Sequence, residues 1–129
     1  MASLLMIAGC ISNTFANIQD VGVQRYDAKP VTMADMERVI RIAAFQEEWQ
    51  KADLVEPGHM VVTKVDENGE RSMTVDVLFT TTLFSIKYKD SRGYHYDPAA
   101  NRIDHHYLSM TDDLRDRIRE TLQVITPSS

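Results

Sequence analysis

Hydrophobic residues recur at helical spacing in the first half of the chain. They stand three or four positions apart and so share one face of a helix: Met36, Val39, Ile40, Ala43 and Ala44. Thr32 precedes them with Asp35 three positions on, and both side chains can accept hydrogen bonds from the backbone N–H groups at a helix start. We predict a helix that runs to about Gln50, with Trp49 buried near its end.

A second helical pattern closes the chain. Its apolar residues again recur at helical spacing: Leu114, Ile118, Leu122 and Ile125. We place its cap between Ser109 and Asp112 and its end at Pro127, because proline cannot continue a helix.

Between these helices, apolar and polar residues alternate with the period of a β-strand. The clearest case is residues 73–79, where Thr74 and Asp76 separate apolar neighbours. Pro57-Gly58 and Asn68-Gly69 are turn signals, the second being typical of a hairpin. The predicted strands cover residues 60–65, 73–79 and 84–89, with a turn at 90–93 and a last short strand at 103–108.

This order predicts an α+β fold: a helix, a three- to four-stranded antiparallel meander and a second helix. Each helix has one apolar stripe and each long strand one apolar face, so we expect both helices on one face of the sheet. The domain is assigned to residues 30–126. Residues 10–29 have no clean periodicity and many polar side chains, which favours a tether.

Composition narrows the class of protein. The chain has 129 residues, of which 43% are hydrophobic and 26% charged, as in a globular domain. Its net charge of -5 and pI near 5.3 argue against nucleic acid as a partner, because phosphate contacts need a basic surface. A single cysteine excludes an internal disulfide and any multi-cysteine metal site.

That cysteine, Cys10, follows an apolar run that ends in two small residues, Leu4-Leu5-Met6-Ile7-Ala8-Gly9. The order resembles the lipobox of bacterial lipoprotein signal peptides. The resemblance implies cleavage after Gly9, which makes residues 1–9 a signal-peptide remnant, and acylation of Cys10 with palmitate-type chains that anchor the protein in a membrane. Because Ile11 is not acidic, the resemblance further implies an outer-membrane lipoprotein facing the periplasm. The alternative is a cytoplasmic domain whose apolar start belongs to its fold.

A longer pattern follows the cysteine. It comprises Trp49, the Pro57-Gly58 turn, the segment Phe84-Ser85-Ile86-Lys87-Tyr88, the Tyr-x-Tyr-Asp stretch at 94–97 and the closing amphipathic helix. Over residues 30–125 the chain resembles small Gram-negative lipoproteins of unassigned function. The resemblance implies an envelope location and supplies no catalytic residue.

Imidazoles and carboxylates gather in the last third of the chain: His95, Asp97, Asp104, His105 and His106. They are common ligands of zinc. If residues 103–108 form a strand, neighbouring side chains point to opposite faces and His105 cannot share an ion with His106. His105 is then expected near the core, and Asp104, His106 and His95 are the candidate zinc ligands. The alternative is a polar sheet surface with titratable histidines.

Aromatic residues also cluster in the sequence: Tyr88, Tyr94, Tyr96 and Tyr107, with Phe79 and Phe84. They suit either a binding surface or cross-strand pairs that hold the sheet in register, and we favour the structural role.

The sequence contains neither a glycine-flanked nucleophile nor a glycine-rich phosphate loop. The favoured function is therefore a non-enzymatic interaction domain of the cell envelope. Its sheet face, carrying Thr74, Asp76, Ser85 and Lys87 and extended by His106, would bind an envelope protein, peptidoglycan or a small molecule. The alternative function is a metal-binding protein or metal-dependent hydrolase that uses Asp104, His106 and His95.

Overall fold

A computed structural model describes residues 12–127 of the chain. These residues form two helices and seven strands, in the order β1 (Ser12–Thr14), β2 (Ile18–Gly22), α2 (Met33–Gln46), β3 (Lys51–Glu56), β4 (His59–Val65), β5 (Ser72–Phe79), β6 (Leu83–Arg92), β7 (Arg102–Asp104) and α3 (His105–Val124). The fold is α+β, as the sequence predicts.

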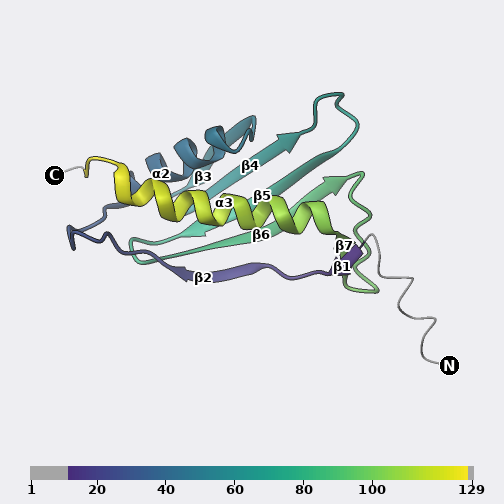
Figure 1. Cartoon of the computed structure of the whole chain (residues 1–129), viewed down its shortest axis with the longest axis horizontal. Helices are drawn as coiled ribbons and strands as arrows, with labels where there is room; N and C mark the ends of the chain where they lie inside the picture. Colours follow the sequence, from purple (N-terminus) through teal and green to yellow (C-terminus); the bar gives the residue numbers. More distant parts are fainter. Residues whose placement is uncertain (1–11, 128–129) are drawn as a thin grey trace.

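The main sheet has five antiparallel strands in the order β2-β6-β5-β4-β3 (Figure 1). Strands β3 to β6 form the expected meander, since each pairs with the next along the chain. The sheet has more strands than the predicted three or four. Strand β2 precedes the first helix and adds to the far edge, beside β6, while β1 and β7 form a separate two-stranded sheet.

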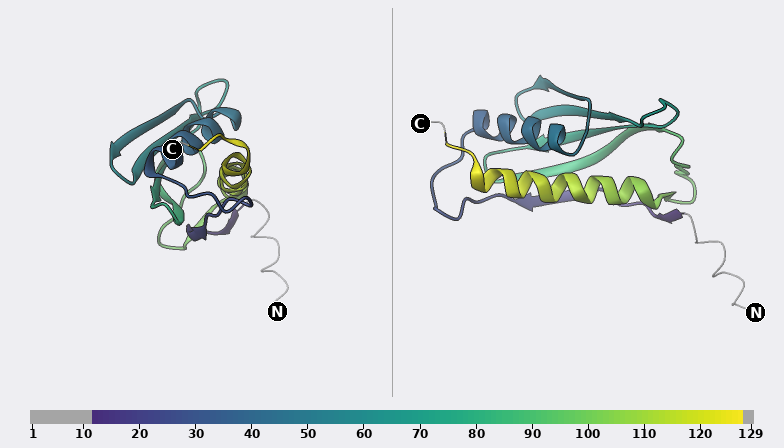
Figure 2. Two further views of the ribbon diagram at one scale, coloured as in Figure 1. Left: turned by 90° about the vertical axis from the view of Figure 1, so that its left-hand side faces the viewer. Right: turned by 45° about the horizontal axis from the view of Figure 1, so that its top comes forward.

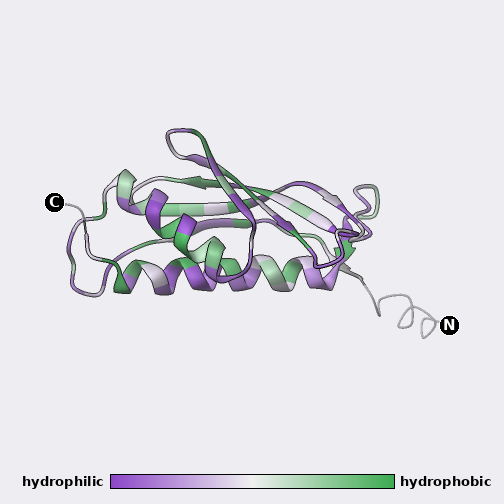
Figure 3. Cartoon of the chain, turned by 90° about the horizontal axis from the view of Figure 1, so that it is seen from above, coloured by the Kyte–Doolittle hydropathy of each residue, from purple (hydrophilic) through white to green (hydrophobic). Residues whose placement is uncertain are grey.

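Both helices lie on the same side of the main sheet (Figure 2). Figure 3 shows hydrophobic and hydrophilic bands alternating along each helix, as expected where one side of a helix is buried. The fully buried core joins α2 and α3 to the inward-facing residues of β4, β5 and β6. Strand β5 illustrates the alternation, because Met73, Val75, Val77 and Phe79 are buried and the residues between them are half-buried.

The first helix begins where the sequence predicts. The Thr32 hydroxyl accepts a hydrogen bond from the Asp35 backbone N–H, and the Asp35 carboxylate accepts one from the Thr32 N–H. All five predicted apolar positions are buried. The helix ends at Gln46, earlier than predicted, and Trp49 beyond it is 3% exposed beneath the Lys64 ammonium, which confirms its place in the core.

The segment expected to be a tether is structured from Ser12 onward. Strand β1 pairs with β7, β2 pairs with β6, and Val23 joins the hydrophobic core. The prediction of a tether is therefore wrong between Ser12 and Val23, which belong to the folded domain. Cys10 and the lipobox-like run lie outside the described residues.

Two further differences concern strand boundaries. Strand β3 was not predicted, because Lys51–Glu56 is an edge strand with mostly exposed residues and no alternation. The turn expected at 90–93 is wrong for its first three residues, because β6 continues to Arg92 and pairs there with Ser72. The register of β5 and β6 shifts by one residue between Thr74 and Val75, which pair with Asp90 and Tyr88, and Lys89 is left out of the pairing.

Candidate functional site

The face of the sheet that points away from the helices carries the side chains predicted to form a binding surface. Thr74, Asp76, Ser85 and Lys87 share this face, and Asp76 lies directly opposite Lys87 on the neighbouring strand. Ser85 is 7% exposed, because its hydroxyl accepts a hydrogen bond from the Asp20 N–H of β2. Thr74, Asp76 and Lys87 are half-buried and remain accessible, whereas Ser85 contributes little to the surface.

His59 lies on the same face and was not among the predicted site residues. Its Nε2 atom is 2.7 Å from a carboxylate oxygen of Asp76, and its Nδ1 atom is 3.7 Å from Glu56. Beside this pair, the hydroxyls of Thr63 and Thr74 are 3.3 Å apart. Because both ring nitrogens of His59 face carboxylates, the ring links Asp76 of β5 to Glu56 at the end of β3. The sequence signal for this position was alternation: His59 lies two residues before Val61 and four before Thr63, so all three side chains share the outer face of β4.

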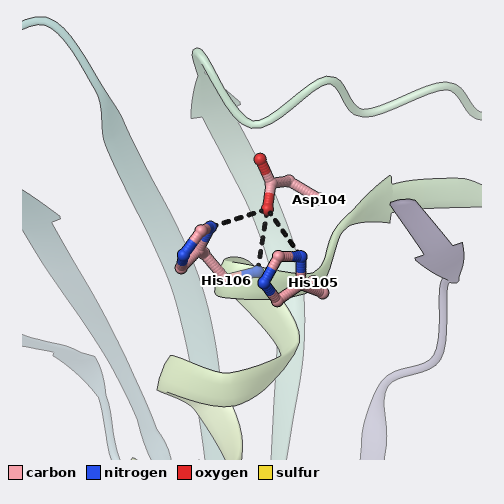
Figure 4. Close-up of side chains that lie close together, drawn as sticks. All are labelled: Asp104, His105 and His106. Carbon is pink, nitrogen blue, oxygen red and sulfur yellow. Dashed lines mark hydrogen bonds and ion pairs between the residues drawn. The ribbon is translucent and has the colours of Figure 1, made fainter. Parts of the chain in front are cut away.

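A second group of polar side chains lies at the junction of β7 and α3 (Figure 4). The predicted strand at 103–108 is wrong: β7 ends at Asp104 and α3 begins at His105, so the cap expected between Ser109 and Asp112 is also wrong. Asp104 is the capping residue, and its side chain accepts a hydrogen bond of 2.9 Å from the His106 backbone N–H.

This helix start brings together two histidines that were expected to point apart. The Nδ1 atoms of His106 and His105 lie 3.0 and 3.6 Å from the same oxygen, Oδ1 of Asp104. The two rings lie 4.2 Å apart between centroids and are tilted by 32°. Their side chains are 49% and 56% exposed for His105 and His106. The expectation that His105 is near the core is therefore wrong, and so is the extension of the sheet face by His106.

His95 does not join this group. It is an exposed residue of the loop between β6 and β7, with a φ of 55°. Within residues 12–127, the group of three metal-ligand side chains whose donor atoms lie within 4.8 Å of one another consists of Asp104, His105 and His106. The predicted triad of Asp104, His106 and His95 is therefore wrong in one member. Asp97 is also elsewhere, since its backbone pairs with Arg102 and its side chain accepts a hydrogen bond from the Ala100 N–H.

Asp104 is held firmly at this junction. Its backbone N–H donates to the Tyr94 carbonyl at 2.8 Å, and its side chain is only 12% exposed. Burial raises the pKa of Asp104, but hydrogen bonds from the backbone and ring of His106 outweigh it, and the net pKa shift is downward. The carboxylate is thus ionised at neutral pH and accepts from its neighbours.

Three of the predicted tyrosines form one cluster. Tyr88, Tyr96 and Tyr107 pack around Phe15, a residue of the N-terminal segment that sequence reasoning missed. Tyr107 is 1% exposed, and its burial raises the pKa of its hydroxyl. Tyr94 lies elsewhere, under the guanidinium of Arg71. This burial supports a packing role for the aromatic residues.

An open groove of about 1110 Å³ lies between residues 22–28 and the C-terminal half of α3. Charged groups of both signs, including Arg119 and Glu120, line it beside the exposed Tyr26 and Val124. Arg25 also lines it, and its guanidinium donates to the backbone carbonyls of Leu122 and Ile125 and pairs with Asp27. Because Arg25 is fully engaged in these contacts, it supports the helix end.

Comparison of the chain with protein-family models, with curated proteins and with solved structures finds no match. Neither helix of residues 12–127 is both long and apolar enough to cross a bilayer.

Proposed function

We propose that this chain is a non-enzymatic interaction domain of the bacterial cell envelope, held at the outer membrane through acylated Cys10 and facing the periplasm. The observation that carries the proposal is the division of the sheet into two unlike faces. Both helices cover one face, and the other presents hydrogen-bonding and charged groups that no described helix covers.

The residues of this open face suit a polar partner. Asp76 and Lys87 offer opposite charges on adjacent strands, and His59 and Thr74 add ring nitrogens and a hydroxyl. Polar groups arranged on a rigid sheet lose little conformational freedom on binding, which favours recognition without catalysis. An envelope protein or peptidoglycan provides the amide and hydroxyl groups that such a face can bind.

The anchor is supported by the order Ile7-Ala8-Gly9-Cys10, which resembles a lipobox. The described residues begin at Ser12, where β1 starts, only two residues after Cys10. An acylated Cys10 would therefore hold the β1–β7 end of the domain near the membrane surface. The test is mass spectrometry of the N-terminal peptide from protein made in a Gram-negative host, for which we expect an acylated Cys10. An unmodified chain that retains Met1 would contradict the anchor.

The open face can be tested separately. Thr74→Arg and Lys87→Glu alter its shape and charge, and Asp113→Arg on the exposed side of α3 is a matched control. We expect the wild-type chain and the control to co-sediment with purified sacculi, or to form the same photo-crosslinks in native envelopes, and both face variants to lose this binding. Equal binding by all four proteins would contradict the assignment of the face.

A further inference from the structure

We propose that Asp104, His105 and His106 form a binding site for one divalent transition-metal cation of the Zn²⁺, Ni²⁺ or Cu²⁺ class. The proposal does not depend on the membrane anchor or on the open sheet face. It rests on where the start of α3 places one carboxylate and two imidazoles (Figure 4).

The donor types fit this class of ion. Two imidazole nitrogens and one carboxylate oxygen are borderline ligands, which suit zinc and its neighbours better than calcium or magnesium. Three protein ligands are also the number found in zinc sites that keep a fourth position for water. Because both rings are about half exposed, solvent can reach that fourth position.

The distances are close to those that an ion requires. Zinc bound at about 2.0–2.1 Å by tetrahedrally arranged ligands separates its donor atoms by about 3.3 Å. The distances from Asp104 Oδ1 to Nδ1 of His106 and of His105 are 3.0 and 3.6 Å, one on each side of that value. The three donor atoms all lie within 4.8 Å of one another, and both histidine rings are exposed enough to adjust.

Helix capping alone explains only part of this arrangement. A capping aspartate needs to accept from a backbone N–H, and Asp104 does so with that of His106. Capping does not require the Nδ1 atoms of two successive histidines to face the same oxygen. An ion at this point would bind the lone pair of each Nδ1 atom, with the single proton of each neutral ring carried on Nε2 and exposed to solvent.

The carboxylate is fixed before any ion arrives. Asp104 ends β7, which pairs with β1 so that Asp104 lies opposite Ser12, and its N–H is bound to the Tyr94 carbonyl. A ligand held in this way by the fold loses little freedom on binding, whereas the two exposed rings must be ordered. We therefore expect a site of moderate affinity.

The experiment uses the full chain with Cys10→Ser, which removes the single thiol as a competing ligand, and Zn²⁺ alone as the probe. Titration against a chromophoric zinc indicator should show one ion per chain. His105→Ala and His106→Ala should each weaken binding about tenfold or more. Asp104→Asn should also weaken it while preserving the helix cap, because asparagine caps helices as well as aspartate does.

His95→Asn is the matched control, since His95 is an exposed histidine that the structure places outside the cluster. Its affinity for Zn²⁺ should equal that of the parent chain. In ¹⁵N spectra of the histidine rings, added Zn²⁺ should shift the Nδ1 signals of His105 and His106 and leave those of His59 and His95 in place. Unchanged affinity in both His→Ala variants, or ring signals that move first at His95, would overturn the proposal.

Discussion

Single side chains secure both ends of α3. At its start, the Asp104 carboxylate accepts from the His106 N–H at 2.9 Å. At its end, the Arg25 guanidinium donates to the carbonyls of Leu122 and Ile125 at 2.7 and 2.8 Å. These are the ends at which a helix has unpaired N–H and C=O groups, and the charges match its dipole. Both contacts join α3 to parts of the chain outside the helix.

The capping role of Asp104 predicts a loss of stability on truncation. Asp104→Ala should lower the free energy of unfolding by about 1 kcal/mol, and by up to about 2, because the His106 N–H loses its acceptor. Asp104→Asn should cost less, since the amide oxygen can still accept. Urea unfolding in the presence of a chelator, with Asp113→Ala as an exposed control, measures the difference. Equal losses for the two Asp104 variants would contradict this role.

Asp27 predicts a pH dependence at the other end of the helix. Its hydrogen bond with Arg25, followed by that from the Lys29 N–H, lowers the pKa of Asp27 from 3.8 to about 2. Because the folded-state pKa is depressed, the stability from this group is present above about pH 4 and is lost as the pH falls through about 2.

The measurement compares the free energy of unfolding of the wild-type chain and Asp27→Asn across this range. The variant should show a shallower decline between about pH 4 and pH 2. Asp113→Asn should follow the wild-type profile, because Asp113 is an exposed residue on α3. Parallel profiles for wild type and Asp27→Asn would count against the Arg25–Asp27 interaction as the source.

At the scale of elements, α3 is the longer of the two described helices, and it carries a long buried stripe. Its apolar stripe begins at Tyr107 and continues through Leu114, Ile118 and Leu122, all at most 1% exposed. The N-terminal segment packs along the same helix and sheet edge, with Phe15 in the tyrosine cluster and Val23 in the core. Stability therefore depends on how well the two ends of the chain pack together.

Leu114→Ala tests this packing. Leu114 is 0% exposed, so its truncation should leave a cavity and lower the free energy of unfolding by about 2–5 kcal/mol. Val124→Ala on the same helix is the control, because Val124 is 81% exposed and should change stability by no more than about 0.5 kcal/mol. Chemical denaturation with far-UV circular dichroism gives both values. A small effect of Leu114→Ala would mean that α3 packs loosely.

At the scale of the whole molecule, the domain is built by joining distant parts of the sequence. Strand β2 closes one edge of the main sheet against β6, and β1 pairs with β7 at the start of α3. The two faces of the sheet consequently differ, one covered by helices and one polar, and the Asp104 cluster lies at the β1–β7 end.

Truncation tests how much β1 and β2 contribute to the stability of the fold. Removal of residues 1–11 leaves β1, β2 and every other element described above in place, and this protein is the reference. Removal of residues 1–22 also deletes β1, β2 and Phe15, and should lower the melting temperature by roughly 4 °C or more for each kcal/mol lost. Differential scanning calorimetry of the two truncated proteins compares them directly. Equal melting temperatures would show that β1 and β2 add little to the fold.

The sequence predicts those elements whose signals are local. The Thr32–Asp35 cap, the five buried positions of α2 and the alternation in β5 all depend on residues a few positions apart. It also predicts that Thr74, Asp76 and Lys87 share a sheet face, because that follows from the two-residue period of a strand. The sequence does not predict β3 or β2, because these strands form through pairing with a neighbouring strand and carry no clear alternation of their own.

The sequence by itself therefore determined the α+β class, the first helix and the two-sided strands, since hydrophobic periodicity is a local property of the chain. Only the tertiary structure decided where β2 adds, that His59 meets Asp76, and that His105 and His106 converge on Asp104. The β2 contacts join residues 65 positions apart, as in the hydrogen bond from Asp20 to Ser85. The position of the histidine pair depended on whether the residues after Asp104 continue the strand or begin a helix, and the Asp104 carboxylate caps a helix there by accepting from the His106 N–H.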